Sequence, residues 1–535
     1  MRVCSSDYRF FFLLAAVFSV HFFLLQGLAE DAFISFRYGQ NLASGHGLVW
    51  NVGEPPIEGY TNFLWVLLSA LGLLLGFNAG IWSVVLGGLA GLGSIWIVYL
   101  WCRTIYAMTP GGAAIPAGLL VVTGPFVAWA GSGMETTFFG LLILGGSYLF
   151  ARYWQQARVM LLVQSAALFA LAAMTRPEGV LVFAMLGGMA LIAMFGRPVR
   201  SRRDLLLPVL VFTILFGSYF LWRYDYFGWL LPNTFYAKTG GGMAQALRGM
   251  KYSAYFYAFF VAPLLLPVAV TLTWRLRGGS ERPRARARTP LQAFADSLPW
   301  ILPFFVAACY SVYVTAVGGD YMAMFRFYAP VMPFIALGVG AIVSSSGIAQ
   351  GGTGLVAATI STAALLVVHS TPLEARFFSK PENMHGTWRG LRTEAWHVNR
   401  LGVIGRYFDE TRKSYDDSLA TDAIGVISYL ANMKIIGMHG LVDTHIAHKE
   451  FAEGEIGSGL PGHERGDLPY ILSKKPTFLM YNRALTPEPF ARMPDDSYAG
   501  VRDILERDYE PKSVRLEDAA NGETGYFTYY RRIEE

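Results

Sequence analysis

Eleven apolar segments, each about the length of a membrane-crossing helix, occupy the first 370 residues of the chain. A helix needs about 20 mostly apolar residues to cross a hydrocarbon core about 30 Å thick. Composition agrees, because 54% of the 535 residues are hydrophobic and 15% are charged, whereas soluble domains carry roughly 25% charged residues. The chain is therefore predicted to be a polytopic α-helical membrane protein. The segments lie near residues 10–28, 81–101, 113–130, 136–151, 159–174, 180–195, 205–222, 253–273, 299–317, 328–345 and 354–370.

Basic residues between these segments predict the orientation. The amino terminus, the turn at 152–158 and the arginine clusters at 197–203 and 275–288 are all expected on the cytoplasmic side, facing lipid rather than nucleic acid. A further apolar segment at 62–77 has only about 16 residues, which is short for a full crossing. If it is re-entrant or interfacial, all four basic groups fall inside. If it crosses fully, the 152–158 turn falls outside, unless a later span is broken.

The first apolar run and the last 165 residues set the ends of the predicted membrane module. The first run spans about 19 residues, longer than the apolar core of a signal peptide, so we expect an uncleaved first helix. From residue 371 the chain is charged, aromatic and interrupted by Gly and Pro. We therefore predict a multi-spanning module at 1–370 with an outer loop at 29–61, and a soluble α/β domain at 371–535 on the periplasmic or extracellular side.

An acidic pair, Glu30 and Asp31, ends the first span. Charge at a lipid boundary is unfavourable unless a cavity, a partner or a substrate compensates. If a short helix starts here, Asp31 and Tyr38 share one face and Glu30 and Arg37 another. One carboxylate could then face a cavity while Arg37 holds the other. The alternative is an ordinary helix N-cap, for which acidic residues are also favoured, and the spacing alone does not decide.

Three cations in the predicted outer loops are candidates for binding phosphate. Arg176 lies in TRPEG, Lys238 lies in the aromatic run LPNTFYAK, and Arg326 follows Asp320. The structural alternatives are an Arg–Glu pair at the membrane interface and a lysine that reaches out of an aromatic belt. The sequence alone does not decide between phosphate binding and these structural alternatives.

Metal and nucleotide sites have no clear signature. The tail carries the polar set His439, Asp443, His445 and His448, but its spacing fits no standard zinc pattern. No GxSxG, P-loop or Gly-rich dinucleotide motif is present. We therefore assign no cofactor, and a divalent cation stays open.

Several motifs in order along the chain resemble those of the GT-C glycosyltransferases. The likeness is closest to the terminal arabinofuranosyltransferases of the mycobacterial cell wall and their relatives. The motifs are DAFISFRY (31–38), GHGLVWN (45–51), EGYTNFLW (58–65), GMET (133–136), TRPEG (175–179), LPNTFYAK (231–238), GD (319–320) with FRF (325–327), and GLVDTHIA (440–447).

This resemblance implies an enzyme with about 11–13 membrane segments in a bacterial inner membrane. Such an enzyme takes a sugar, here most simply arabinofuranose, from a polyprenyl-phosphate donor on the outer face. The sugar passes to a cell-surface glycan or protein acceptor, and the carboxyl-terminal domain helps to hold that acceptor. The family often has two Asp where this chain has Glu30 and Asp31, which makes Asp31 the better catalytic candidate.

Glycosyl transfer needs a carboxylate that takes the acceptor proton or stabilises an oxocarbenium-like transition state. It also needs cations that stabilise the departing phosphate. Asp31 is assigned to the first role, with Glu30 beside it, and Lys238, Arg176 and Arg326 to the second. The other expected substrate contacts are Arg37, Tyr38, His46, Glu58, Asn62, Glu135, Glu178, Asn233, Tyr236 and Asp320. The alternative function is a transporter or flippase of lipid-linked sugar, but the polar residues gather at span ends and no inverted repeat is visible.

Overall fold

The computed structural model describes residues 4–196, 203–277, 289–345, 353–371, 388–451, 456–457, 459–489 and 500–533. Most of the two arginine clusters used for orientation lie outside these residues. The chain forms two compact units that interleave along the sequence. Unit 1 comprises Met1–Gly27, Ser83–Trp222 and Leu247–Leu391, and unit 2 comprises Leu28–Trp82, Arg223–Ala246 and Arg392–Glu535.

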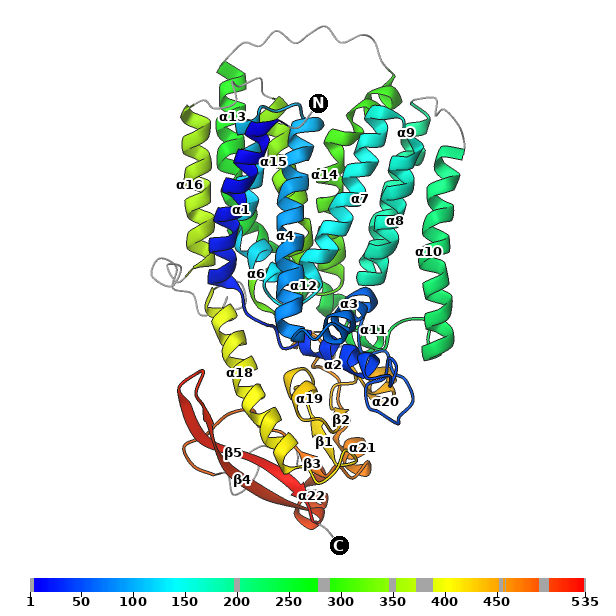
Figure 1. Cartoon of the computed structure of the whole chain (residues 1–535), viewed down its shortest axis with the longest axis vertical. Coiled ribbons are helices and arrows are strands. Elements are labelled where there is room, and N and C mark those ends of the chain that lie inside the picture. Colours follow the sequence, from blue (N-terminus) through cyan, green and yellow to red (C-terminus); the bar gives the residue numbers. More distant parts are fainter. Residues whose placement is uncertain are drawn as a thin grey trace. The chain divides into compact units, whose positions relative to one another are not determined.

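Unit 1 is built of long apolar helices that lie side by side (Figure 1). Among the described residues, six helices are long and apolar enough to cross a membrane, or seven if the bent pair α5 and α6 is one span. The helices are α1 (Ser5–Leu25), α4 (Ala79–Thr104), α5 (Pro110–Val121), α6 (Gly124–Ala130), α7 (Thr136–Gln156), α8 (Val159–Thr175), α9 (Glu178–Met194), α10 (Arg203–Phe227), α12 (Gly242–Phe256), η1 (Tyr257–Val261), η2 (Ala262–Leu264), α13 (Leu265–Arg277), α14 (Pro290–Ala316), η3 (Ala323–Val331), α15 (Met332–Ser345) and α16 (Thr353–Ser370).

Each of the eleven predicted spans coincides with helix, but three are not single α-helices. Segment 328–345 begins in the 3-10 turn η3 and continues as α15. Segment 113–130 is the pair α5 and α6, bent by 69°. Segment 253–273 passes through the π turn η1 and the 3-10 turn η2, where Pro263 cannot donate a backbone hydrogen bond. The polytopic membrane fold is confirmed, and the number of crossings stays a prediction.

The short apolar segment at 62–77 forms α3 (Phe63–Leu74), a helix of 12 residues. Such a helix is about 18 Å long, which is less than the thickness of a hydrocarbon core. It packs along α2 (Ala32–Ala43), and both helices belong to unit 2. This agrees with the interpretation that 62–77 does not cross fully.

Unit 2 contains the α/β fold predicted for the tail. Its five-stranded sheet has the order β2-β1-β3-β5-β4. Strand β1 is parallel to β2 and β3, whereas β5 is antiparallel to β3 and β4. The elements are β1 (Ser418–Thr421), β2 (Lys434–Gly437), β3 (Phe478–Leu479), β4 (Tyr509–Asp518), β5 (Glu523–Arg532), α11 (Asn233–Lys238), α18 (Trp388–Thr411), α19 (Val426–Leu430), α20 (Thr444–His448), α21 (Leu468–Ser473) and α22 (Arg502–Asp508).

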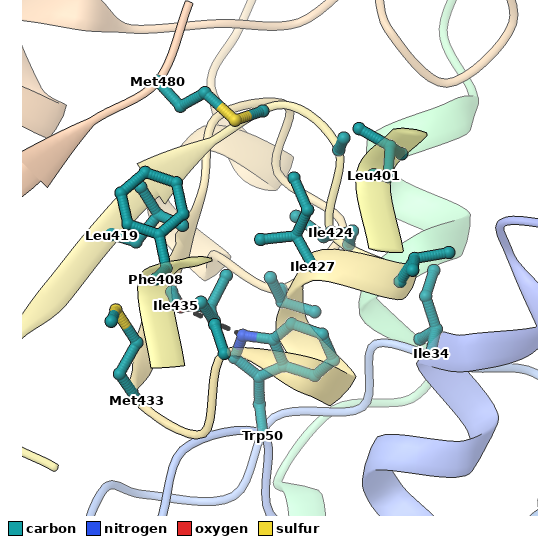
Figure 2. Packing of buried hydrophobic residues seen from close by; sticks show 14 of the residues in the cluster. Ile34, Trp50, Leu401, Phe408, Leu419, Ile424, Ile427, Met433, Ile435 and Met480 are labelled. Atoms are coloured by element: carbon teal, nitrogen blue, oxygen red, sulfur yellow. Dashed lines mark hydrogen bonds between the residues drawn. The ribbon is translucent and has the colours of Figure 1, made fainter. Parts of the chain in front are cut away.

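The main core of unit 2 joins the 29–61 loop to the sheet domain (Figure 2). Trp50, which is 2% exposed, lies among side chains that include Leu419 and Ile435. Its indole Nε1 donates to the carbonyl of Ile435 at 3.0 Å, so the ring is buried with its one polar group satisfied. Ile34 of α2 belongs to the same core. The loop and the sheet domain therefore share one hydrophobic core.

Candidate active site

The acidic pair lies at the start of α2, inside unit 2. Asp31 immediately precedes the first helical residue, but its side chain makes no capping hydrogen bond. The Glu30 carboxylate accepts from the backbone N–H of Gly425 at 2.5 Å, and the Glu30 N–H donates to the Glu394 carboxylate at 3.0 Å. Burial, with the nearby charge of Asp31, raises the pKa of Glu30 to about 8. Asp31 is therefore not used as an ordinary cap, and Glu30 is a buried anchor.

Gly425 allows this contact because it has no side chain. A Cβ at this position would lie 2.1 Å from the Glu30 carbonyl oxygen and 2.6 Å from its carboxyl carbon. Real Cβ atoms do not approach other atoms so closely, so only glycine fits against the acidic pair.

The basic groups around the acidic pair come from the sheet domain. Burial lowers the pKa of His463, and the charge of Arg483 lowers it as well, whereas the charge of Asp31 raises it. The charge of Arg483 also lowers the pKa of Glu30. Arg483 is itself bound to the carboxylate of Asp422. Burial, with the charges of Arg483 and Arg400, lowers the pKa of His397 to about 4. The imidazole of His397 is therefore neutral near pH 7.

Arg483, His397 and His463 were not predicted from the sequence, although strand ends could have indicated Arg483 and its neighbours Asp422 and His439. Asp422 directly follows β1, His439 lies shortly after β2, and Arg483 lies shortly after β3. The carboxyl ends of parallel strands meet at one edge of a sheet, where ligands commonly bind. Finding them required the strand order, because β3 is only two residues long.

Arg37 does not hold a carboxylate, contrary to our expectation. Its guanidinium donates to the carbonyls of Trp50 at 2.8 Å and Met433 at 3.0 Å, to the side-chain oxygen of Asn51 at 2.9 Å, and to the carbonyl of Ser428. Four oxygen acceptors replace the water around a buried cation. Arg37 thus ties the loop to the sheet domain.

Two other expected substrate contacts of the loop, Tyr38 and Asn62, make hydrogen bonds within the protein, whereas His46 does not lie in the interior. The Tyr38 hydroxyl donates to the carbonyl of Ile57 at 2.6 Å and accepts from the N–H of Gly59 at 3.0 Å. The Asn62 amide donates to the Ser35 hydroxyl at 2.9 Å. His46 is exposed.

Glu58 is held by Arg223, a partner that the sequence did not identify. The Arg223 Nε lies 3.0 and 2.8 Å from the two carboxylate oxygens, and Nη2 lies 2.6 Å from one of them. Both side chains are 3% exposed. Arg223 follows the predicted span at 205–222, and such a position at a span end is the signal that could have indicated a pairing partner.

The LPNTFYAK segment is held by the sheet domain. The Asn233 amide donates to the carbonyls of Gly440 at 2.6 Å and Leu441 at 3.0 Å. The Tyr236 ring lies 4.2 Å from the ring of His448. Lys238 is exposed, and its Cε would lie 3.1 Å from a Cβ placed on Gly462. Gly462 directly precedes His463. The loop that adjoins Lys238 therefore also contains the histidine whose pKa is affected by the charge of Asp31.

The other candidates form a buried charge network inside unit 1. Arg176 pairs with Glu135 and Glu178, each at 2.8 Å, and Arg326 pairs with Asp320 at 2.5 Å. The ring of Phe327 lies 5.4 Å from the Arg176 guanidinium carbon and 5.1 Å from that of Arg326. Glu135, Glu178 and Asp320 therefore orient the two cations.

The tail histidines do not form a metal-binding arrangement. His439 contacts the carbonyl of Arg465 at 2.8 Å, and His445 contacts the Asp467 carboxylate at 3.3 Å. The Asp443 carboxylate accepts from Lys474 at 2.6 Å. Within the described residues, no three His, Cys, Asp or Glu side chains are grouped so that they could hold a metal ion.

Comparison with known sequences finds matches to parts of the chain. Residues 389–530 match a family described as a domain of unknown function (DUF8728). A curated relative, the terminal beta-(1->2)-arabinofuranosyltransferase of Mycobacterium tuberculosis, is 32% identical over 333 residues, which is 58% of this chain and 51% of the relative. The chain thus spans about half the length of the curated relative that it matches.

Solved structures match over almost the whole chain. ArnT from Cupriavidus metallidurans bound to undecaprenyl phosphate has a TM-score of 0.58 and 13% identity, covering 98% of both chains. Its apo structure has a TM-score of 0.57 and 14% identity, covering 97% of both chains. The chain is therefore a multi-pass membrane protein with a GT-C-like fold, and part of its sequence is similar to a terminal beta-(1->2)-arabinofuranosyltransferase.

Proposed function

We propose that this protein is a membrane glycosyltransferase that moves a sugar from a polyprenyl-phosphate donor to a cell-surface glycan or protein. The observation that carries the proposal is the state of the acidic pair. Asp31 makes no helix-capping hydrogen bond, while Glu30 anchors the same turn to Gly425. A carboxylate whose place is set by an anchored neighbour suits proton transfer, because a general base must be held in a defined position.

In the proposed reaction, the acceptor hydroxyl oxygen attacks the anomeric carbon of the donor sugar. Asp31 takes the hydroxyl proton as the new carbon–oxygen bond forms. The bond from the anomeric carbon to the phosphate oxygen breaks, and polyprenyl phosphate leaves with the electron pair. The ammonium of Lys238 stabilises the charge that develops on the phosphate.

Other features support further parts of the proposal. Arabinofuranose as the donor sugar rests on the name of the similar mycobacterial enzyme, and the polyprenyl-phosphate carrier on the undecaprenyl phosphate bound to ArnT. Arg176 and Arg326 are already paired with carboxylates, so their contact with phosphate stays a prediction. We place the reaction on the outer face of a bacterial inner membrane, because the basic clusters predict that orientation.

Replacing Asp31 by Asn tests the proposal. Asn has the same shape but cannot take the proton, so transfer is expected to fall by about 100- to 10,000-fold, while binding of undecaprenyl phosphate is retained. Transfer is measured in membranes with a synthetic polyprenyl-phosphate arabinofuranose, and mass spectrometry detects the product glycan. The control is Asp416→Asn, which changes a carboxylate that is 83% exposed. Normal transfer by the Asp31 variant would contradict the proposal.

A null strain distinguishes the flippase alternative. Loss of an outer-surface sugar with normal donor lipid on the outer leaflet supports a transferase. Accumulation of the lipid-linked sugar on the cytoplasmic leaflet would instead support a flippase.

A further inference from the structure

Arg465 of the sheet domain makes hydrogen bonds on both sides of Lys238. Its Nε donates to the carbonyl of Ala237 at 3.1 Å, and its Nη2 donates to the carbonyl of Thr239 at 2.9 Å. The remaining Nη1 donates to the carbonyl of Lys449 at 2.6 Å. Arg465 is 9% exposed, so a buried guanidinium is satisfied by three backbone carbonyls.

These contacts act on the end of a very short helix. The helix α11 has six residues and ends at Lys238, so its last carbonyls lack partners within the helix. An arginine that donates to such carbonyls stabilises the helix end, because it supplies hydrogen bonds and a favourable charge. Because the carbonyls of Ala237 and Thr239, the residues on either side of Lys238, are both held by Arg465, the backbone that carries the Lys238 side chain is held in place.

Neighbouring residues of the same loop reinforce this arrangement. A Cβ on Gly241 would lie 2.4 Å from the Cα of Gly457, so the two backbones are in close contact there. The ring of His448 lies 4.2 Å from the ring of Tyr236 and 4.2 Å from that of Trp229. The segment that carries Lys238 is thus held at several points by the sheet domain.

We propose that Arg465 is a positioning residue that orients Lys238 toward the phosphate of the lipid donor. The inference rests on the proposed function, in which Lys238 stabilises that phosphate. It assigns the sheet domain a role in donor binding, in addition to the acceptor role that the family resemblance implies. Arg465 acts through the backbone on either side of Lys238 and does not itself contact the donor.

Two substitutions separate positioning from simple attraction by charge. Arg465→Lys keeps the charge but loses the planar fork, so a single ammonium cannot serve three separate carbonyls. Arg465→Gln removes the charge as well. Affinity for undecaprenyl phosphate is measured by titration of the full chain in detergent. We expect both variants to raise the Kd by about 10-fold, which is typical when a residue that orients a ligand-binding group is lost.

A double-mutant cycle with Lys238→Met tests whether Arg465 acts through Lys238. Lys238→Met alone should raise the Kd by about 10-fold or more, because a charge-assisted hydrogen bond is lost. Adding Arg465→Lys to Lys238→Met should cause no further loss, because coupled residues are not additive. A general loss of structure would weaken binding in both backgrounds.

A control variant shows whether any loss of an arginine in this domain weakens binding. Arg412→Gln removes an arginine of the same domain that pairs with Asp409, and it should leave the Kd unchanged. Each variant is titrated below its own unfolding temperature, and Arg465→Met replaces the Gln variant if the latter does not fold. A normal Kd for Arg465→Lys, with weakened binding only for Arg465→Gln, would contradict the inference that Arg465 orients Lys238. The same would follow if the effects of Arg465→Lys and Lys238→Met on the free energy of binding were additive. An unchanged Kd for Lys238→Met would overturn the donor role of Lys238 itself and the inference with it.

Discussion

At the scale of single residues, the contact between Glu30 and Gly425 sets the position of the acidic pair. Replacing Gly425 by Ala would put a Cβ 2.1 Å from the Glu30 carbonyl oxygen, so the turn must move. We expect a loss of about 1–3 kcal/mol in the free energy of unfolding, typical of overpacking, and a marked fall in sugar transfer. Thermal unfolding and the transfer assay measure the two effects. Gly500→Ala is the matched control, because a Cβ there meets nothing within 4 Å.

The protonation of Glu30 leads to a second prediction at this scale. Its pKa is raised to about 8 in the folded protein, chiefly by burial and also by Asp31 and Glu394, against the opposing effects of Gly425 and Arg483. The unfolded value is about 4.3. Between these values the folded state holds the proton and the unfolded state does not, so the contribution of Glu30 to stability is lost as pH rises from about 4.5 to 8.

Glu30→Gln mimics the protonated acid and should remove this pH dependence. The measurement is the unfolding temperature of wild type minus that of the variant, followed from pH 4.5 to 8.5. The difference should become more negative as pH rises, whereas the exposed control Glu450→Gln should give a flat difference. The difference is used because His397 also makes stability depend on pH. Its pKa is lowered to about 4 in the folded protein, so its contribution to stability is lost as pH falls below about 6.5, and subtraction removes this contribution. A flat difference for Glu30→Gln would contradict a protonated Glu30.

At the scale of elements, the sequence predicted the apolar helices well because periodicity and hydropathy are local properties. Segment 113–130 shows the limit, since nothing in its hydropathy indicated the bend between α5 and α6. Arg176 was predicted to bind phosphate, and Glu135 and Glu178 to contact substrate; the structure pairs Arg176 with both carboxylates, and the predicted contacts with substrate stay predictions. His463 and Arg465 could not be found in this way, because their partners lie far away in the sequence and depend on tertiary packing.

Trp50 gives a prediction for the loop that contains it. Trp50→Ala would empty a site that is 2% exposed and leave the carbonyl of Ile435 without its indole partner. We expect unfolding to become easier by about 3–5 kcal/mol, with earlier proteolysis of the sheet domain on heating. Trp396→Ala changes a side chain that is 48% exposed and serves as the control. Equal effects of the two substitutions would show that the loop does not contribute to the core.

At the scale of the whole molecule, the units do not follow the order of the chain. The domain family matches residues 389–530 alone, yet the core of unit 2 also contains Ile34, Trp50 and Phe227. A fragment that begins near residue 388 would expose the apolar surface that these side chains cover, and such surface promotes association or loss of fixed packing.

We therefore expect the fragment 388–533, expressed alone, to bind a hydrophobic dye and to lack a cooperative unfolding transition. Joining residues 28–61 to its amino terminus through a Gly/Ser linker should restore part of the core and reduce dye binding, because Ile34 and Trp50 return to it. The same fusion with Trp50→Ala is the matched control and should restore less. A monomeric fragment that unfolds cooperatively without the loop would show that the sheet domain folds by itself. In that case the loop would bind to a sheet domain that is already folded, and the acidic pair could separate from Gly425 without unfolding the sheet domain.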